Sequence, residues 1–252
     1  MAEGTEAVVL RTLRYGEADL IAHVLTRHAG RRGVIAKGAR RPKSRLGARL
    51  EPFLAVSLQL FEGRGDLAVV RAVDVVAAHD AVRSSWRAQQ VGAAALDLVS
   101  RITIEHQPNE PTYHLLRNFL DLLDSTATRT GAVADDDDQR GATLLVAFEL
   151  KLLHALGLAP QLGACVRCGD EVALVAFSAH DGGMVCSGCR TAGDQTLDRS
   201  TWEAAVDLMR APLAQIATRS AESLPGQHAL RTISSGIVAA TCREHAGVTP
   251  RR

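Results

Sequence analysis

Four cysteines of this 252-residue chain stand in two Cys-x-x-Cys pairs. Cys165 and Cys168 form the first pair, Cys186 and Cys189 form the second, and residues 169–185 separate them. Each pair offers two thiolates from one tight turn, and two facing turns can close a tetrahedral cage of four sulfur ligands. Because such a cage leaves no ligand position open, we expect one structural Zn²⁺ rather than a catalytic metal.

The spacing of the cysteines does not by itself exclude other uses of these thiols. An iron–sulfur cluster, a redox pair or four unrelated cysteines would need the same residues. A disulfide framework is disfavoured, because the cysteine count is odd (Cys242 is the fifth) and the chain starts without a signal-peptide pattern. Gly169 and Gly188 are expected to give the two turns backbone freedom.

A second candidate site is a run of basic side chains. No acidic residue occurs between Asp19 and Glu51, although the net charge of the whole chain is only +1. A local basic block in a near-neutral protein indicates a polyanion-binding face, and nucleic acid is the favoured ligand over an acidic protein or a merely solvated loop. The candidate DNA-binding residues are Arg31, Arg32, Lys37, Arg40, Arg41, Lys43, Arg45 and Arg49.

Binding by such a block would be mainly electrostatic and independent of base sequence. Tyr15, Phe53 and Phe61 are aromatic residues that could stack on bases. Their spacing within the expected strands favours Phe53 and Phe61 as core residues instead.

The elements before residue 79 are expected to be strands. Short runs rich in β-branched residues end at glycine-containing turns, which predicts five strands at 8–14, 19–27, 31–38, 53–61 and 67–76. Five short strands in so short a segment fit a small barrel of the OB-fold kind, a fold that often binds oligonucleotides. Residues 1–78 are therefore predicted to form an OB-fold DNA-binding domain.

From residue 79 the apolar spacing changes to that of helices. Helices are expected near 86–102, after Asn109, at 143–156, around Trp202 and at 227–244, with 126–140 and its run Asp135–Asp138 as a solvated loop. The predicted fold class is α+β: a five-stranded OB-fold barrel, then an all-α domain over 79–252. This second domain holds an inserted four-cysteine zinc module at about 161–196.

Motifs of several enzyme classes are missing from the sequence. It has no P-loop, no GxGxxG after a strand, no GxSxG and no HExxH. We therefore expect a non-enzymatic protein. Without a signal-peptide pattern or a long apolar run, a cytoplasmic location is expected.

Two segments resemble the RecO family of bacterial recombination mediators. The first comprises residues 15–21, 25–26 and 30, followed by 36–44, which includes Lys37-Gly38-Ala39-Arg40-Arg41-Pro42-Lys43. The second comprises 148–153, 156–160 and Leu162, leading into Cys165-Val166-Arg167-Cys168-Gly169. The likeness runs through nearly the whole chain in the same order, and the two segments together are highly specific.

The resemblance implies an OB-fold, binding of single- and double-stranded DNA, and strand annealing without ATP. It implies partnership with RecR, contact with the C-terminal tail of the single-strand-binding protein, indirect help in loading RecA, and a nucleoid-associated location. Lys37, Arg40, Arg41 and Lys43 match the family's basic DNA-binding stretch. The four paired cysteines match its metal ligands.

Three other functions use the same features. The main alternative is a zinc-ribbon OB-fold regulator or RNA-binding module without a recombination role. An adaptor that binds only protein is another, and it would lack salt-dependent DNA binding. A metal-dependent nuclease or deaminase is least favoured, because such a deaminase needs a His-x-Glu motif beside its Cys-x-x-Cys, which this sequence lacks.

Overall fold

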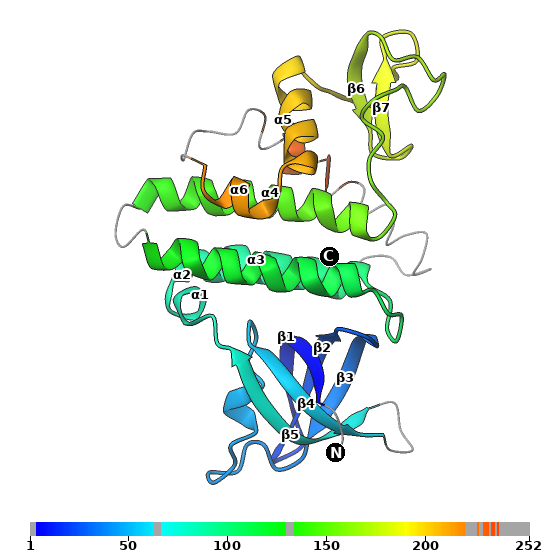
Figure 1. The fold of residues 1–252 in the computed structure, drawn as a ribbon. Coiled ribbons are helices and arrows are strands. Elements are labelled where there is room, and N and C mark those ends of the chain that lie inside the picture. Colours follow the sequence, from blue (N-terminus) through cyan, green and yellow to red (C-terminus); the bar gives the residue numbers. More distant parts are fainter. Residues whose placement is uncertain are drawn as a thin grey trace. The chain divides into compact units, whose positions relative to one another are not determined.

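Five strands form a closed barrel at the start of the chain (Figure 1). The computed structural model describes residues 4–62, 67–129 and 134–219, with 226, 229–231, 233, 234 and 236 beyond them. The barrel strands are β1 (Thr5–Tyr15), β2 (Asp19–Thr26), β3 (Gly30–Ala36), β4 (Ala55–Phe61) and β5 (Ala68–Ala77). Their order is β1-β2-β3-β5-β4, antiparallel except between β3 and β5. The predicted five-stranded barrel is confirmed.

Alternation along the strands fills the barrel with small aliphatic side chains. Ala7 and Val9 of β1, for example, are fully buried in the same core as Ala22 and Val24 of β2. Burial of side chains on one face of each strand is what fixes the strand register. The 3₁₀ turn η1 (Gly47–Arg49) leads to Leu50, which joins this core.

The expectation that both phenylalanines belong to the core is wrong for Phe61. Its side chain is 52% exposed, and the Arg71 guanidinium lies 4.9 Å from the ring centroid. Phe53 is half-buried in a left-handed backbone conformation, with its ring facing Gly92. The β4 strand begins only at Ala55, so Phe53 is not a strand residue.

Three helices pack with the barrel in one compact unit, residues 1–131. They are α1 (Asp80–Ser84), α2 (Trp86–Ile102) and α3 (Glu110–Arg129). The Ser85 side chain caps α2, and the Asn109 side chain accepts a hydrogen bond of 2.9 Å from the Thr112 amide at the start of α3. Both α2 and α3 contact β1.

Residues 132–252 form the second compact unit. It contains α4 (Ala134–Ala155), the sheet strands β6 (Leu174–Ser178), β7 (Gly183–Cys186) and β8 (Gln195–Thr196), then α5 (Arg199–Arg210) and α6 (Leu213–Ala217). The helix α4 contacts both α5 and α6, and the Lys151 ammonium donates a 2.9 Å hydrogen bond to the Met209 carbonyl. The small sheet has the order β7-β6-β8 and lies inside the cysteine-containing segment.

Two expectations about helices need correction or remain open. The predicted loop at 126–140 is wrong, because α3 continues to Arg129 and α4 begins at Ala134. The run Asp135–Asp138 therefore belongs to the start of α4 and not to a loop. The predicted helix at 227–244 lies largely outside the described residues, as does Cys242.

The predicted domain boundary at residue 78 stays a prediction. None of the helices in the described ranges has the length and apolar character needed to cross a membrane.

Candidate metal centre and candidate nucleic-acid interface

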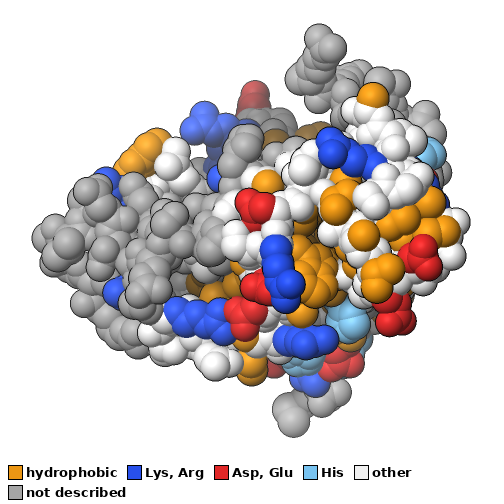
Figure 2. All heavy atoms as spheres, turned by 90° about the horizontal axis from the view of Figure 1, so that it is seen from above, with side chains coloured by type: hydrophobic (Ala, Val, Ile, Leu, Met, Phe, Trp, Pro, Cys, Tyr) orange, Lys and Arg blue, Asp and Glu red, His pale blue; other side chains and the backbone are white. Residues whose placement is uncertain are grey.

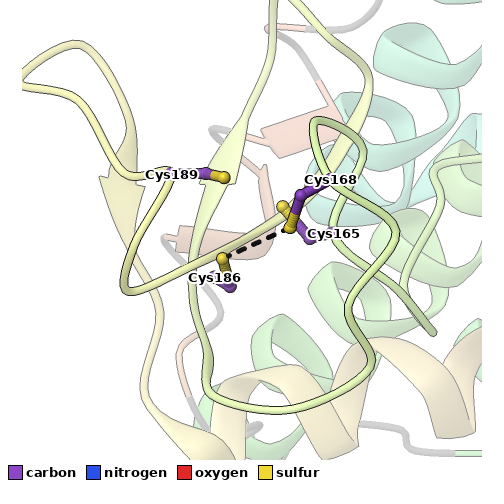
Figure 3. A group of neighbouring side chains, drawn as sticks. All are labelled: Cys165, Cys168, Cys186 and Cys189. Carbon is purple, nitrogen blue, oxygen red and sulfur yellow. Dashed lines mark hydrogen bonds between the residues drawn. The ribbon is translucent and has the colours of Figure 1, made fainter.

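The four predicted cysteine ligands converge on one point of the second unit (Figure 3). Their sulfur atoms all lie within 4.8 Å of one another, and the Cys168 and Cys186 sulfurs are 3.7 Å apart. Zinc–sulfur bonds of about 2.3 Å in a tetrahedron place the sulfurs about 3.8 Å apart. The cluster thus has the donor atoms and the spacing to hold one metal ion.

Tight turns of the backbone aim each pair of thiols inward. In the first turn the Gly169 amide donates to the Cys165 carbonyl at 2.8 Å, and Gly169 has a φ of +85°. In the second, the amides of Cys189 and Arg190 donate to the Cys186 carbonyl at 3.1 and 3.0 Å. The expected role of Gly169 is confirmed, whereas Gly188 does not adopt a positive φ.

A buried apolar patch supports the sulfur cluster from the sheet side. Cys165 and Cys186 are both nearly buried, against Ala176 of β6 and Val185 of β7. Cys186 ends β7 and pairs with Leu174 across the sheet. The sheet therefore fixes the direction from which the second Cys pair reaches the centre.

The surroundings of Cys165 favour its ionised form. Its pKa is lowered to about 6, chiefly because the backbone amide of Cys186 donates a hydrogen bond to the sulfur, while burial acts in the opposite direction. The thiolate is the form of cysteine that binds metal. The pKa values of Cys168 and Cys189 are shifted upward instead, because neighbouring thiols of the cluster oppose their ionisation. Four cysteine sulfurs fit a closed tetrahedral site that leaves no position for a substrate.

One side chain between the cysteines ties the two turns together. Arg167 donates to the Cys189 carbonyl at 2.6 Å, so the first turn holds the second. Its guanidinium also makes two hydrogen bonds to the Asp194 carboxylate, at 2.6 and 2.9 Å, and one to Asp181 at 2.8 Å. The Asp194 side chain is only 3% exposed, so Arg167 neutralises a carboxylate that water hardly reaches.

These contacts shift both pKa values in the direction of a stable ion pair. The pKa of Asp194 is held far below its usual value, first by Arg167 and then by the Thr191 amide. The pKa of Arg167 is raised, first by Asp194. Arg167, Asp181 and Asp194 were not among the predicted site residues, and the only local sign of this group in the sequence is an arginine inside the first Cys-x-x-Cys motif.

Five of the eight predicted DNA-binding residues lie together in the segment 37–45, here called the basic loop. The structure places this loop between β3 and η1, and all five of these side chains are exposed: Lys37, Arg40, Arg41, Lys43 and Arg45. Arg40 donates to the backbone carbonyls of Gly16 and Glu17. Within the described ranges, no side chain of the basic loop pairs with a carboxylate.

The loop is anchored to the neighbouring turn between β1 and β2. The Gly38 amide donates to the Asp19 carboxylate at 2.7 Å, and the Arg40 amide donates to the Ala18 carbonyl at 2.9 Å. Gly38 has a φ of +66°, a conformation that favours glycine. The cations therefore project from a backbone that the barrel holds in place.

The other three predicted DNA-binding residues have partners within the same unit. Arg31 pairs with Glu105 at 2.7 Å and also donates to the Thr103 carbonyl. Arg32 pairs with Glu62 at 2.8 Å. Arg49 donates to the carbonyl of Val73 and pairs with Asp74, at 2.9 and 3.4 Å. Arg31 and Arg32 are only 16% and 13% exposed, so they are built into the fold.

One face of the molecular surface shows side chains of both charges. In the face drawn in Figure 2, lysine and arginine side chains lie among aspartate and glutamate side chains. The basic loop differs from that pattern in the absence of carboxylate partners among the described residues.

Comparisons with known proteins agree over both units. The model named "Recombination protein O N terminal" matches residues 1–79, and "Recombination protein O C terminal" matches residues 83–251. A DNA repair protein RecO of Anaeromyxobacter sp. (strain K) is 37% identical over 193 residues, covering 75% of this chain and 71% of the relative. A DNA repair protein RecO of Anaeromyxobacter dehalogenans (strain 2CP-C) is 34% identical over 233 residues, covering 90% and 87%. The chain therefore belongs to the RecO family of DNA repair proteins.

Proposed function

We propose that this protein is a recombination mediator that binds and anneals single-stranded DNA and helps load RecA onto strands coated by single-strand-binding protein. It acts by binding rather than by catalysis, and it needs no ATP. Its place of action would be the cytoplasm, at the nucleoid. The observation that carries the proposal is the basic loop, whose exposed cations lack carboxylate partners among the described residues.

The physical barrier to annealing is the repulsion between two polyanions. Cations that are not already neutralised by the protein can lie between two phosphate backbones and reduce that repulsion without reading the base sequence. The cations suited to this role are Lys37, Arg41, Lys43 and Arg45. Arg40, the fifth cation of the basic loop, also donates to backbone carbonyls. Arg31, Arg32 and Arg49 would contribute less, because each already has an acidic partner.

The two proposed domains would have different roles. The barrel of residues 1–78 would hold DNA, and residues 79–252 would carry the metal module. The metal is proposed to be Zn²⁺, because four thiolates in a closed tetrahedral arrangement suit it. When bound, it would crosslink the two turns, and Arg167 would keep the second turn in place through the Cys189 carbonyl.

Protein partners are proposed from family membership. We expect RecR and the C-terminal tail of the single-strand-binding protein to bind directly, and RecA to benefit indirectly. Both direct partners would bring the basic loop to the coated strands on which a mediator works.

Annealing of coated strands tests this function. Complementary oligonucleotides, each coated with the cognate single-strand-binding protein, are mixed with the protein without ATP over a series of salt concentrations. Annealing should accelerate, and affinity for bare single strands should fall with salt by a log–log slope of about −0.7 for each neutralised phosphate.

A competition arm separates the proposal from its alternatives. If coated strands stay apart while bare DNA still binds, the mediator role is contradicted. If single-stranded RNA displaces DNA at equal concentration and coated strands stay apart, an RNA-binding module fits better. If no nucleic acid binds, the protein-only adaptor fits better.

A further inference from the structure

The basic loop lies against the turn that joins β1 to β2. Residues 16–18 form this turn, and Tyr15 and Asp19 close it as the last pair of the two strands. The Arg40 amide donates a hydrogen bond of 2.9 Å to the Ala18 carbonyl, and the Arg40 guanidinium donates to two further carbonyls of the turn. The turn therefore contacts the loop close to the point where the loop leaves β3.

Asp19 contributes its side chain to this junction. Its carboxylate accepts a hydrogen bond of 2.7 Å from the Gly38 amide. Gly38 has a φ of +66°, so the chain changes direction at this residue, in a conformation that other residues adopt only at a cost. The contact from Asp19 therefore fixes the direction in which the loop begins.

Apolar contacts hold the loop from the side of the barrel. Ala39 is 4% exposed and belongs to the barrel core, and Leu46 packs against the same core. Gly47 approaches so closely that a β-carbon on it would lie 2.6 Å from the Ala39 carbonyl oxygen. The loop is thus attached at Ala39 and again at 46–47, and three of its cations lie between these two points.

The negative charge of Asp19 is unfavourable for binding a polyanion. Its side chain is half-buried at the edge of the basic loop, and among the described residues no cation pairs with it. As a charge alone, Asp19 would repel phosphates beside the loop, and its removal would strengthen binding.

The hydrogen bond of Asp19 acts in the opposite direction. A loop that is already ordered loses less conformational freedom when it binds a ligand, so preorganisation increases affinity. A hydrogen bond to an ionised group contributes more free energy than one screened pair of surface charges. The ordering of the loop should therefore outweigh the repulsion of the phosphates.

We propose that Asp19 is a positioning residue that promotes DNA binding by holding the basic loop in its binding conformation, although it has the same sign of charge as the ligand. The inference rests on the proposed function and goes further, because it names a residue that acts on DNA affinity through the Gly38 amide rather than through contact with DNA.

Three variants of the full chain separate the position of the loop from the charge of the carboxylate. Asp19→Ala should weaken binding of a thymidine oligonucleotide on the order of 10-fold, because a hydrogen bond to an ionised group is lost. Asp19→Asn keeps an oxygen acceptor for the Gly38 amide without the charge, so affinity should equal or exceed that of the parent. Fluorescence anisotropy at fixed salt measures the affinities.

Glu17→Ala is the matched control. It removes the same charge from an exposed side chain two residues away, and it leaves the Asp19 contact in place. Affinity should rise by up to about threefold, the scale of one screened pair of surface charges. Removal of a carboxylate would then have opposite effects at positions 17 and 19.

Trypsin digestion without DNA measures the order of the loop directly. The enzyme cleaves after lysine and arginine, and cleavage of a briefly opened segment follows the population of its open form. Asp19→Ala should be cut within residues 37–45 on the order of 10-fold faster than the parent. Asp19→Asn and Glu17→Ala should be cut at the parent rate. Circular dichroism melting checks that each variant is folded at the assay temperature.

The outcomes distinguish this role from the function on which it rests. An Asp19→Ala variant that binds DNA as well as the parent, or better, would overturn the positioning role. A loss of affinity without faster cleavage of the loop would also overturn it, because the loss would then have another cause. If the parent binds no DNA, the proposed function fails and the positioning role fails with it, whereas the digestion still reports whether Asp19 orders the loop.

Discussion

The basic loop of residues 37–45 and the cysteine module of residues 161–196 both present arginine, but the surroundings of those arginines differ. In the loop, Arg41 and Arg45 are exposed and meet no carboxylate in the described part of the chain. In the module, Arg167 bonds to two aspartates and to the Cys189 carbonyl.

The difference separates two uses of positive charge. A guanidinium whose hydrogen bonds are already satisfied inside the protein fixes backbone geometry and has little left to offer a ligand. An exposed cation without an acidic partner keeps its charge available to a polyanion. The same rule divides the basic block itself, because Arg31 and Arg32 are paired while the basic loop is not.

Removing a cysteine should have the largest effect. Cys186→Ser, or a strong chelator, should abolish metal binding and unfold the module, because its buried core is small and metal binding is worth on the order of 10 kcal/mol in isolated zinc fingers. Metal content and limited proteolysis measure the result. The matched control is Cys242→Ser, and this variant protein should bind metal normally at the four-cysteine cluster. A Cys186→Ser variant that holds metal normally would contradict the closed site.

Reversing charge in the basic loop should come next. Arg41→Glu with Lys43→Glu should weaken DNA binding on all sequences alike and reduce the salt slope by about 1.4 for single strands if each cation neutralises one phosphate. Affinities measured over a salt series give the slope. The single reversal Arg190→Glu, in the module, is compared with Lys43→Glu alone and should leave the slope unchanged. Equal effects at both positions would erase the distinction between the two regions.

Loss of Arg167 should be milder than loss of a cysteine. Arg167→Gln leaves Asp194 without its partner and frees the second turn, so metal affinity should fall about 10–100-fold, as for other residues that support ligands. Arg167→Lys should rescue only partly, because an ammonium cannot make the bidentate contact. Competition with a metal-binding dye measures affinity. Arg190→Ala serves as the control. If Arg190→Ala lowers metal affinity as much as Arg167→Gln does, the contacts of Arg167 have no specific role in supporting the metal site.

The smallest effect concerns pH and the barrel. The pKa of His23 is lowered, first by burial and then by Arg11 and Arg31, so protonation is less favourable in the folded state than in the unfolded state. The unfolded chain therefore binds more protons below about pH 6.5, and stability should decrease as pH falls through that value. His23→Gln should reduce this decrease. Hydrogen exchange of β2 amides at several pH values measures the stability of the barrel. An identical pH profile in the variant would contradict a contribution of His23 to this pH dependence.

Local patterns in the sequence were enough to predict the barrel strands and the clustering of the four cysteines. Strand spacing needs only nearby residues, and the Cys-x-x-Cys pairs carry their own turn geometry. Contacts between residues far apart in the sequence could not be predicted from such local patterns. The ion pair of Arg31 with Glu105 and the register of the barrel strands depend on how the chain folds back. The acidic run at 135–138 was misjudged because its composition suits both a loop and a helix start.

The most direct test of the account is to find where a single strand touches the protein. A thymidine oligonucleotide carrying photoreactive bases is crosslinked to the full chain, and the attached peptides are identified by mass spectrometry. Attachment to the barrel, at the basic loop and the strands beside it, is the predicted result. Attachment confined to residues 161–219 would show that the unit with the cysteine module holds the DNA, and would contradict the central claim.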